Sequence, residues 1–140
     1  IEYPKIGLDI MKKVIKKIIK YKGCILIVDY GFYKPNNQNT LQSVINHKKN
    51  LLFKNLGKAD VTSHVNFELL HEFFFKNNLS VNKVISQKEF LEKMGILQRA
   101  EIIAKNLKFN DQSNLYLRLK RLLSPRLMGE LFKVISAYKF

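Results

Sequence analysis

The sequence contains one cysteine, and its six glycines all stand apart from one another. Cys24 has no partner for a disulfide within the chain. It lies in an apolar run, so we expect a small buried side chain rather than a nucleophile, in a chain suited to the reducing cytoplasm. Because the glycines are not clustered, the chain lacks a loop that brings its backbone close to a nucleotide phosphate at a helix N-terminus.

Several catalytic and metal-binding signatures are also missing. The sequence has no P-loop, no HExxH, no GxSxG and no paired-cysteine zinc spacing. His47, His64 and His71 lie far apart with no second cysteine to join them, and we expect no metal site. The longest apolar run, residues 24–28, has the length of a strand rather than of a membrane span. Lysines interrupt the early apolar residues, which argues against a secretory signal.

The chain has few arginines for its charge. Its formal net charge is +14, and 21 of its 25 basic residues are lysines, against four arginines. Proteins that bind nucleic acid depend strongly on the planar fork of arginine. We therefore interpret most of the charge as solvated surface and expect no nucleic-acid partner. A basic nucleic-acid-binding or scaffold module without catalysis stays open as an alternative function.

The first part of the chain predicts a helix followed by a strand. Between Ile6 and Tyr21, apolar residues recur at helical spacing opposite a lysine face. A basic helix can lie on a membrane, but the β-branched run at residues 23–31 favours docking on a sheet. That run predicts a strand buried on both faces, as in a parallel sheet. Ligands gather at the carboxyl ends of such strands, which makes Asp29 and Tyr30 site candidates.

Residues 32–60 show little periodicity and are rich in Asn, Lys and Gln. A long irregular stretch of this kind is typical of a functional or mobile segment. Beyond it, we expect Thr62 or Ser63 to cap a helix. Asp60 and His64 could form an acid/base pair across that helix start. An Asp favoured by the helix dipole, beside a surface histidine, is the simpler interpretation.

The last third of the chain predicts mostly helices. Ser86 with Glu89 matches a capping box at a helix start. The other predicted elements are a half-buried strand over residues 79–85, helical stripes over 96–107 and 110–123, and a final strand over 131–138. Pro125 ends the second stripe.

Five segments in this order resemble the C-terminal portion of the MidA family of S-adenosylmethionine-dependent methyltransferases. They are KGCILIVDYG, NTLQSVINHK, GKADVTSHVNF, SQKEFLEKMGI and RLLSPRLMGELFKV. The family includes a mitochondrial assembly factor that methylates an arginine of a respiratory complex I subunit. ADVTSHVNF followed by SQKEFL is the most specific match, and the order and spacing of the series strengthen it.

The resemblance implies an α/β fold, the C-terminal part of a Rossmann-like class I methyltransferase sheet with inserted helices. Residues 1–140 would then form a single partial domain. The implied cofactor is S-adenosylmethionine, bound by a glycine loop in an N-terminal half that this chain lacks, and the implied substrate is a protein. The expected partners are thus that substrate and, if the N-terminal half is a separate chain rather than a part trimmed from this one, that half, with no membrane. A non-functional remnant of a split gene is a further alternative.

The resemblance also marks site residues, without fixing their individual roles. The substrate-cleft candidates are Asp29, Tyr30, His47, Asp60, Thr62 and His64, and Gly31, Thr40 and Gln87 also fall on signature positions. No cofactor-binding or metal-binding residue is expected here. Asn66 replaces the usual aspartate, which removes a charged acceptor from the substrate site or from a helix cap. Leu56 replaces the usual proline before Gly57.

Overall fold

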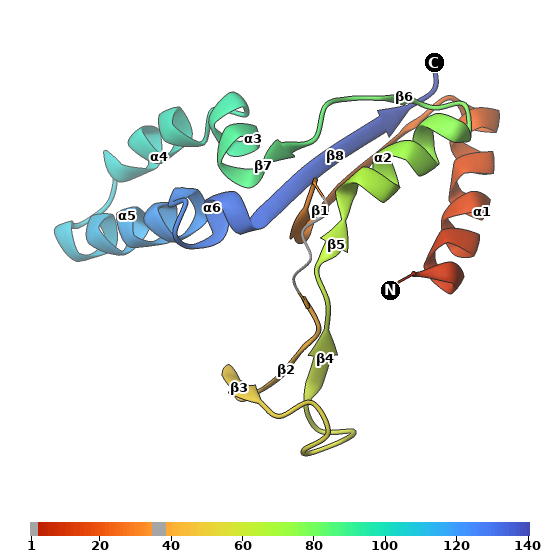
Figure 1. Cartoon of the computed structure of the whole chain (residues 1–140). Helices are drawn as coiled ribbons and strands as arrows, with labels where there is room; N and C mark the ends of the chain where they lie inside the picture. The colour runs from red at the N-terminus through yellow and green to blue at the C-terminus, as the bar shows by residue number, and fades with distance from the viewer. Residues whose placement is uncertain (1–2, 35–38) are drawn as a thin grey trace.

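The computed structural model describes residues 3–34 and 39–140 (Figure 1). A mixed sheet forms the body, with strand order β5-β1-β8-β6, and β7 also pairs with β8. Its strands are β1 (Cys24–Phe32), β5 (Val65–Asn66), β6 (Ser80–Val81), β7 (Ile85–Ser86) and β8 (Phe132–Tyr138). The pairing of β1 with β8 is antiparallel and runs from Cys24 opposite Tyr138 to Tyr30 opposite Phe132. Only the short pairing of β1 with β5 is parallel.

Two helices supply the core on one face of this sheet, α1 (Lys5–Tyr21) and α2 (Phe67–Lys76). The predicted first helix is confirmed: Leu8, Ile15 and Ile18 pack inward and its lysines are exposed, although Val14 and Ile19 of the apolar stripe are exposed as well. The buried core residues are Leu8, Ile15, Ile18, Phe67, Leu70, Phe74, Leu79, Ile135 and Ala137. Ile25 and Ile27 pack against them from β1.

The opposite face of β1 is uncovered, which corrects two expectations. Successive side chains of a strand point to opposite faces, and β1 alternates between exposed and half-buried positions. Leu26 is 52% exposed and Val28 43% exposed. Cys24 is exposed as well, so the prediction of a buried cysteine is wrong. The apolar run predicts burial of both faces of β1. The described residues bury only the face that carries Ile25 and Ile27.

A close approach fixes the carboxyl end of β1. A Cβ added at Gly31 would collide with the carbonyl oxygen of Val65 and would come within 2.8 Å of the Phe67 ring. Gly31 and Val65 are register partners in the parallel pair. A side chain at this position would therefore push apart β1, β5 and the first turn of α2.

The predicted irregular stretch forms most of a three-stranded antiparallel arm, whose third strand begins where the stretch ends. Its strands are β2 (Gln42–Ile45), β3 (Lys48–Asn50) and β4 (Asp60–Thr62), in the order β3-β2-β4. Figure 1 shows this arm projecting from the body, away from α1 and α2. Residues 35–38 of the stretch lie outside the described residues. The prediction missed the strands because each is short and polar, so no alternating apolar pattern marks it.

The cap of α2 lies later than the sequence suggests. Asn66 is the N-cap, and its side-chain oxygen accepts a hydrogen bond from the backbone N–H of Leu69 at 3.0 Å. Thr62 and Ser63 do not cap the helix because the chain first forms β5, where Val65 pairs with β1. Asn is as good a cap as Asp, so the replacement at position 66 keeps the cap and loses only the charge.

Four helices lie beyond the amino-terminal end of β8 in Figure 1. They are α3 (Gln87–Lys93), α4 (Ile96–Ala104), α5 (Phe109–Leu123) and α6 (Met128–Leu131). Ser86 caps α3 as predicted, accepting from the Glu89 N–H at 3.2 Å. The Glu89 carboxylate accepts a hydrogen bond from Lys93 rather than from the backbone of Ser86, as a complete capping box would require. The hydrogen bond from Lys93 lowers the Glu89 pKa. No helix in the described part of the chain is long and apolar enough to cross a membrane.

Buried Gln87 ties this helical group together. Its side-chain nitrogen donates to the carbonyl oxygen of Leu122 at 2.9 Å, which joins the start of α3 to the end of α5. The Gln87 expected from the family pattern thus has a structural contact. Gly129 in α6 lies close enough to the end of α5 that an added Cβ would collide with the Leu123 backbone. Small size at position 129 is therefore needed for the two helices to meet.

Candidate functional site

Three aromatic rings meet where β1 ends. The Tyr30 ring contacts the imidazole of His64 edge-on, with ring centroids 5.6 Å apart. It also contacts Phe132 edge-on at 5.7 Å. The second contact follows from register, because Tyr30 and Phe132 are directly opposite in the antiparallel pair. Edge-to-face pairs hold ring orientation as well as burying area, so Tyr30 is fixed from two sides.

His64 is held from the arm side by Thr40. The backbone N–H of His64 donates to the Thr40 hydroxyl oxygen at 3.1 Å. Thr40 stands just before β2, and His64 lies between β4 and β5. The bond therefore joins the segment by which the chain enters the arm to the segment by which it leaves the arm. Two of the family's signature positions therefore meet here, although they are far apart in the sequence.

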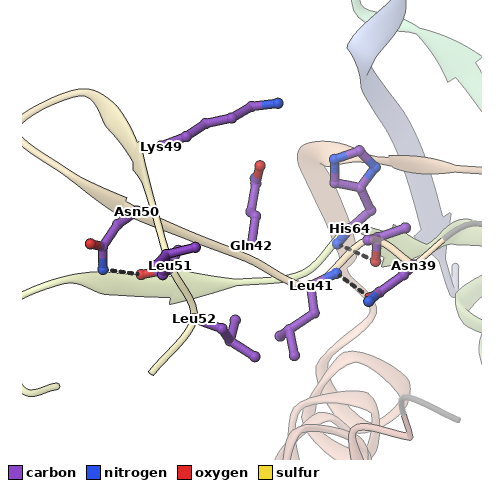
Figure 2. A pocket seen from close by; sticks show the side chains of 10 residues that line it. Asn39, Leu41, Gln42, Lys49, Asn50, Leu51, Leu52 and His64 are labelled. Carbon is purple, nitrogen blue, oxygen red and sulfur yellow. Dashed lines mark hydrogen bonds between the residues drawn. The ribbon is translucent and has the colours of Figure 1, made fainter. Parts of the chain in front are cut away.

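A hollow of about 440 Å³ opens beside this junction. It is lined by Asn39, Thr40, Leu41, Gln42, Ser43, Lys49, Asn50, Leu51, Leu52 and His64. Figure 2 shows His64 and Asn39 at one end, with Lys49 and Asn50 across the hollow on the arm. The lining offers amides, hydroxyls, one imidazole and one ammonium group beside three leucine side chains, and it contains no carboxylate. The arrangement suits a polar segment that needs both donors and acceptors.

A hydrogen-bond network stiffens the arm wall of the hollow. The Asn50 amide donates to the Ser43 hydroxyl at 3.1 Å and to the Lys54 carbonyl oxygen at 2.6 Å. Asn55 in turn donates to the Asn50 side-chain oxygen at 3.2 Å. Ser43 is only 3% exposed. This wall is therefore preorganised, although the sequence offered no signal beyond a richness in asparagine.

Asp29 lies on the other face of the sheet from Tyr30, since neighbouring strand residues alternate. Its side-chain oxygen accepts from the Tyr30 backbone N–H at 2.8 Å. It lies opposite Lys133 in the sheet register. Lys133 pairs instead with Glu130, so the two facing charges form no ion pair. The structure brings Asp29 and Tyr30 to the same strand end but not into one cluster.

The remaining cleft candidates lie on the arm. His47 stands at the turn between β2 and β3, exposed and with a positive φ of 61°. Asp60 begins β4, opposite Val44, and is exposed; Thr62 ends β4 and is half-buried. Asp60 and His64, both in the described part of the chain, share no hydrogen bond or ion pair. The structure therefore brings together Tyr30, Thr40 and His64, and it places His47 at the turn, away from the sheet.

A second tyrosine–histidine contact escaped the sequence analysis. Tyr33, just after β1, meets His71 of α2 edge-on, with ring centroids 6.5 Å apart. No local pattern in the sequence links Tyr33 to His71, because one follows β1 and the other lies in α2. Phe132 was missed for a similar reason. Its place in the cluster depends on the β1–β8 register, which no local pattern encodes.

The described residues do not fit a nucleotide-like cofactor by themselves. The space beside Gly31, near the end of β1, is occupied by the Val65 backbone and the Phe67 ring, so no ligand could approach the backbone there. No carboxylate lines the hollow where a ribose could bind. Within residues 3–34 and 39–140, no three His, Cys, Asp or Glu side chains gather as metal ligands.

Comparison with known proteins assigns the family. Residues 1–85 match the family described as "Putative S-adenosyl-L-methionine-dependent methyltransferase". The chain is 28% identical over 127 residues to the mitochondrial protein arginine methyltransferase NDUFAF7 of Danio rerio, covering 91% of this chain and 30% of that protein. It is 30% identical over 128 residues to the Xenopus tropicalis protein of the same name, covering 91% of this chain and 29% of that protein.

Solved structures agree with this match. An uncharacterized protein from Burkholderia thailandensis superposes with a TM-score of 0.80 at 25% identity, covering 94% of this chain and 36% of that one. A second structure of the same superfamily from that bacterium is bound to S-adenosyl-homocysteine. It superposes with a TM-score of 0.75 at 26% identity, with the same coverage. The chain thus spans about 30% of the length of the curated relatives it matches. The predicted Rossmann-like methyltransferase fold is confirmed, and the chain belongs to the MidA-type family of S-adenosylmethionine-dependent methyltransferases.

Proposed function

We propose that this chain supplies the substrate-side part of an S-adenosylmethionine-dependent methyltransferase that modifies arginine in a protein. The observation that carries the proposal is the contact of Tyr30 with His64 beside the polar hollow, at the end of β1. Its support also includes the fold shared with a relative bound to S-adenosyl-homocysteine. The arginine acceptor is taken from relatives whose names include protein arginine methyltransferase.

Methyl transfer depends mainly on holding the nucleophile in line with the methyl group in a dry cleft. S-adenosylmethionine supplies the electrophilic methyl group when it is bound. Within this chain, Tyr30 offers an aromatic wall fixed between His64 and Phe132. Thr40 holds the His64 backbone against the arm. These residues would orient a substrate side chain and keep water from it.

An arginine substrate places one more demand on the site. Its guanidinium group is always charged and binds best to carboxylates, which also accept the proton released on methylation. The hollow is lined by Lys49 and contains no carboxylate. We therefore assign the hollow to the polar backbone of a peptide substrate. The carboxylates that hold the guanidinium would come from the cofactor-binding part, because Asp29 lies on the face of the sheet opposite Tyr30.

The proposal includes the family's cofactor-binding part, because the described residues do not form a cofactor cradle. It also places the protein in the cytoplasm. The only cysteine is an exposed thiol, which suits a reducing compartment.

A single-chain chimera tests the function. This chain replaces the matched part of the S-adenosyl-homocysteine-bound Burkholderia thailandensis protein. We expect the chimera to bind S-adenosyl-homocysteine by calorimetry. It should also transfer labelled methyl groups from S-adenosylmethionine to a peptide library with a fixed central arginine, and not to the same library with lysine. Cofactor binding without label in arginine would contradict the proposed acceptor.

A basic binding module is the alternative, favoured by the +14 charge and the exposed lysine face of α1. It predicts RNA binding by the chain alone that weakens steeply with salt. Tight RNA binding together with an inactive chimera would favour this function over methyl transfer.

A further inference from the structure

The hollow beside the Tyr30–His64 contact contains one ammonium group without a charged partner. Lys49 lines the hollow, and among the described residues it belongs to none of the ion pairs. An ammonium group has three N–H donors and no acceptor. Its strongest ligands are therefore anionic oxygens, which the hollow itself does not provide.

The arm presents Lys49 together with the Gln42 amide. Lys49 lies opposite Val44 in the β2–β3 register. Gln42 is two residues before Val44 and so shares the face of Lys49, because side chains alternate along a strand. In Figure 2 the Lys49 and Gln42 side chains project to the same side of the arm. The neighbouring Lys48 lies on the opposite face of β3 and does not line the hollow.

The one carboxylate of the arm does not neutralise this charge. Asp60 lies opposite Val44 from the other side, in β4. It thus shares a face with Lys49, but two strand spacings, about 9–10 Å, separate them across the sheet. Asp60 is exposed and does not line the hollow. Between exposed charges at that separation, salt screens most of the attraction.

The surroundings of the hollow also favour an acceptor. Residues 42–62 carry four lysines and one acidic residue, Asp60. The side-chain oxygen of Asn39 accepts from the Leu41 backbone N–H at 3.0 Å, which leaves its NH₂ group as a donor for a ligand. A carboxylate is an acceptor of several hydrogen bonds. It could therefore bind Lys49 while neutral donors of the lining take its second oxygen.

We propose that Lys49 makes this chain select protein substrates that carry a glutamate or aspartate a few residues from the methylated arginine. The acidic side chain enters the hollow, and the arginine lies at the Tyr30–His64 end. The inference rests on the proposed function and names the substrate class of the same site. A partly open ion pair contributes more to selectivity than to affinity. The same ammonium group repels a basic residue at that position, so it discriminates twice.

Peptide titrations of the full 140-residue chain provide the test. The probes are short alanine–glycine peptides with a central arginine and one glutamate, which is moved through the positions on either side. Each has a partner peptide with glutamine in place of glutamate. Amide shifts are followed by nuclear magnetic resonance at physiological ionic strength, where distant charges are screened. We expect shifts at Gln42, Lys49 and His64, and affinity about fivefold higher for glutamate than for glutamine. This preference should hold at one position or two neighbouring ones.

Matched variants assign the preference to one lysine. Lys49→Met keeps most of the aliphatic stem and should abolish the preference for glutamate. Lys48→Met removes the same charge from the adjacent, equally exposed position and should leave the preference unchanged. Lys49→Glu should reverse it in favour of a peptide with lysine at that position. The amide spectrum of each variant shows directly whether its fold is kept.

Four results would overturn the inference. One is the absence of a shift in the hollow with any peptide, and another is an equal effect of glutamate at every position. The third is an equal loss in the Lys48 and Lys49 variants. The fourth is the same set of shifts with acetate alone, which would make the hollow a simple anion site.

The proposed function fails separately. The titrations contain no S-adenosylmethionine, so a glutamate preference at the hollow stands even if the chimera transfers no methyl group. Conversely, a chimera that methylates arginine equally with glutamate or glutamine nearby keeps the proposed function and rejects this inference. In an active chimera, Lys49→Met should raise KM for the glutamate peptide and leave kcat unchanged, as the loss of uniform binding does.

Discussion

The ring of Tyr30 and the imidazole of His64 meet edge-on at 5.6 Å, although the whole β2-β3-β4 arm separates them in the sequence. Tyr30 lies near the carboxyl end of β1, and His64 is the point at which the chain returns from the arm. The contact therefore ties arm and sheet together at the place where ligands collect in open α/β sheets.

Removing the Tyr30 ring should loosen this junction. Tyr30→Ala loses two edge-to-face contacts, each worth about 0.5–1.5 kcal/mol. We expect a loss of about 1–3 kcal/mol in the free energy of unfolding, measured in urea. Tyr30→Phe keeps both rings in contact and should lose little. Tyr116→Ala is the control, because Tyr116 is 51% exposed on α5 and has no ring partner among the described residues.

Gly31 should tolerate no side chain. Gly31→Ala would force apart the Val65 carbonyl and the Phe67 ring, which we expect to cost about 1–3 kcal/mol as overpacking does elsewhere. Gly23→Ala, just before the same strand, is a matched control because nothing lies within 4 Å of its added Cβ. Equal thermal stability of the two variants would contradict the close approach.

The hydrogen bond from His64 to Thr40 should be measurable at one amide. Thr40→Val removes the accepting hydroxyl and should cost about 1 kcal/mol. Thr40→Ser keeps the acceptor. We expect hydrogen exchange at the His64 amide to quicken in the valine variant and to stay slow in the serine variant. Unchanged exchange in both would show that Thr40 does not hold His64.

The cap of α2 predicts how position 66 responds to change. Asn66→Ala removes the acceptor of the Leu69 N–H and should cost about 1 kcal/mol. Asn66→Asp keeps the cap and adds a negative charge at the helix N-terminus, which should stabilise by about 0.3–1 kcal/mol. If the aspartate variant instead changes methyl transfer by the chimera and not stability, the carboxylate acts on the substrate rather than on the helix.

Local patterns predict the helices of this chain well. The spacing of apolar residues in α1 and the box at Ser86 are properties of neighbouring residues, so they appear in the sequence as directly as in the structure. The cap of α2 could not be chosen this way. Thr62, Ser63 and Asn66 are all good caps, and the pairing of Val65 with Gly31 decides among them.

The candidate site could be predicted only as separate pieces. The end of the apolar strand marks Tyr30, and the family pattern marks His64. Their contact depends on the path of the arm, and the contact with Phe132 depends on the β1–β8 register. The exposed face of β1 was mispredicted for a related reason. An apolar strand looks the same in sequence whether its cover comes from its own chain or from another.

The most direct test of the account is methyl transfer by the single-chain chimera with and without the Tyr30 ring. The account predicts that the chimera labels peptide arginine from S-adenosylmethionine. It also predicts that Tyr30→Ala lowers this rate at least tenfold while the affinity for S-adenosyl-homocysteine stays within twofold. Equal rates in the two chimeras would contradict a substrate-side role for Tyr30 and His64. So would S-adenosyl-homocysteine binding by this chain alone.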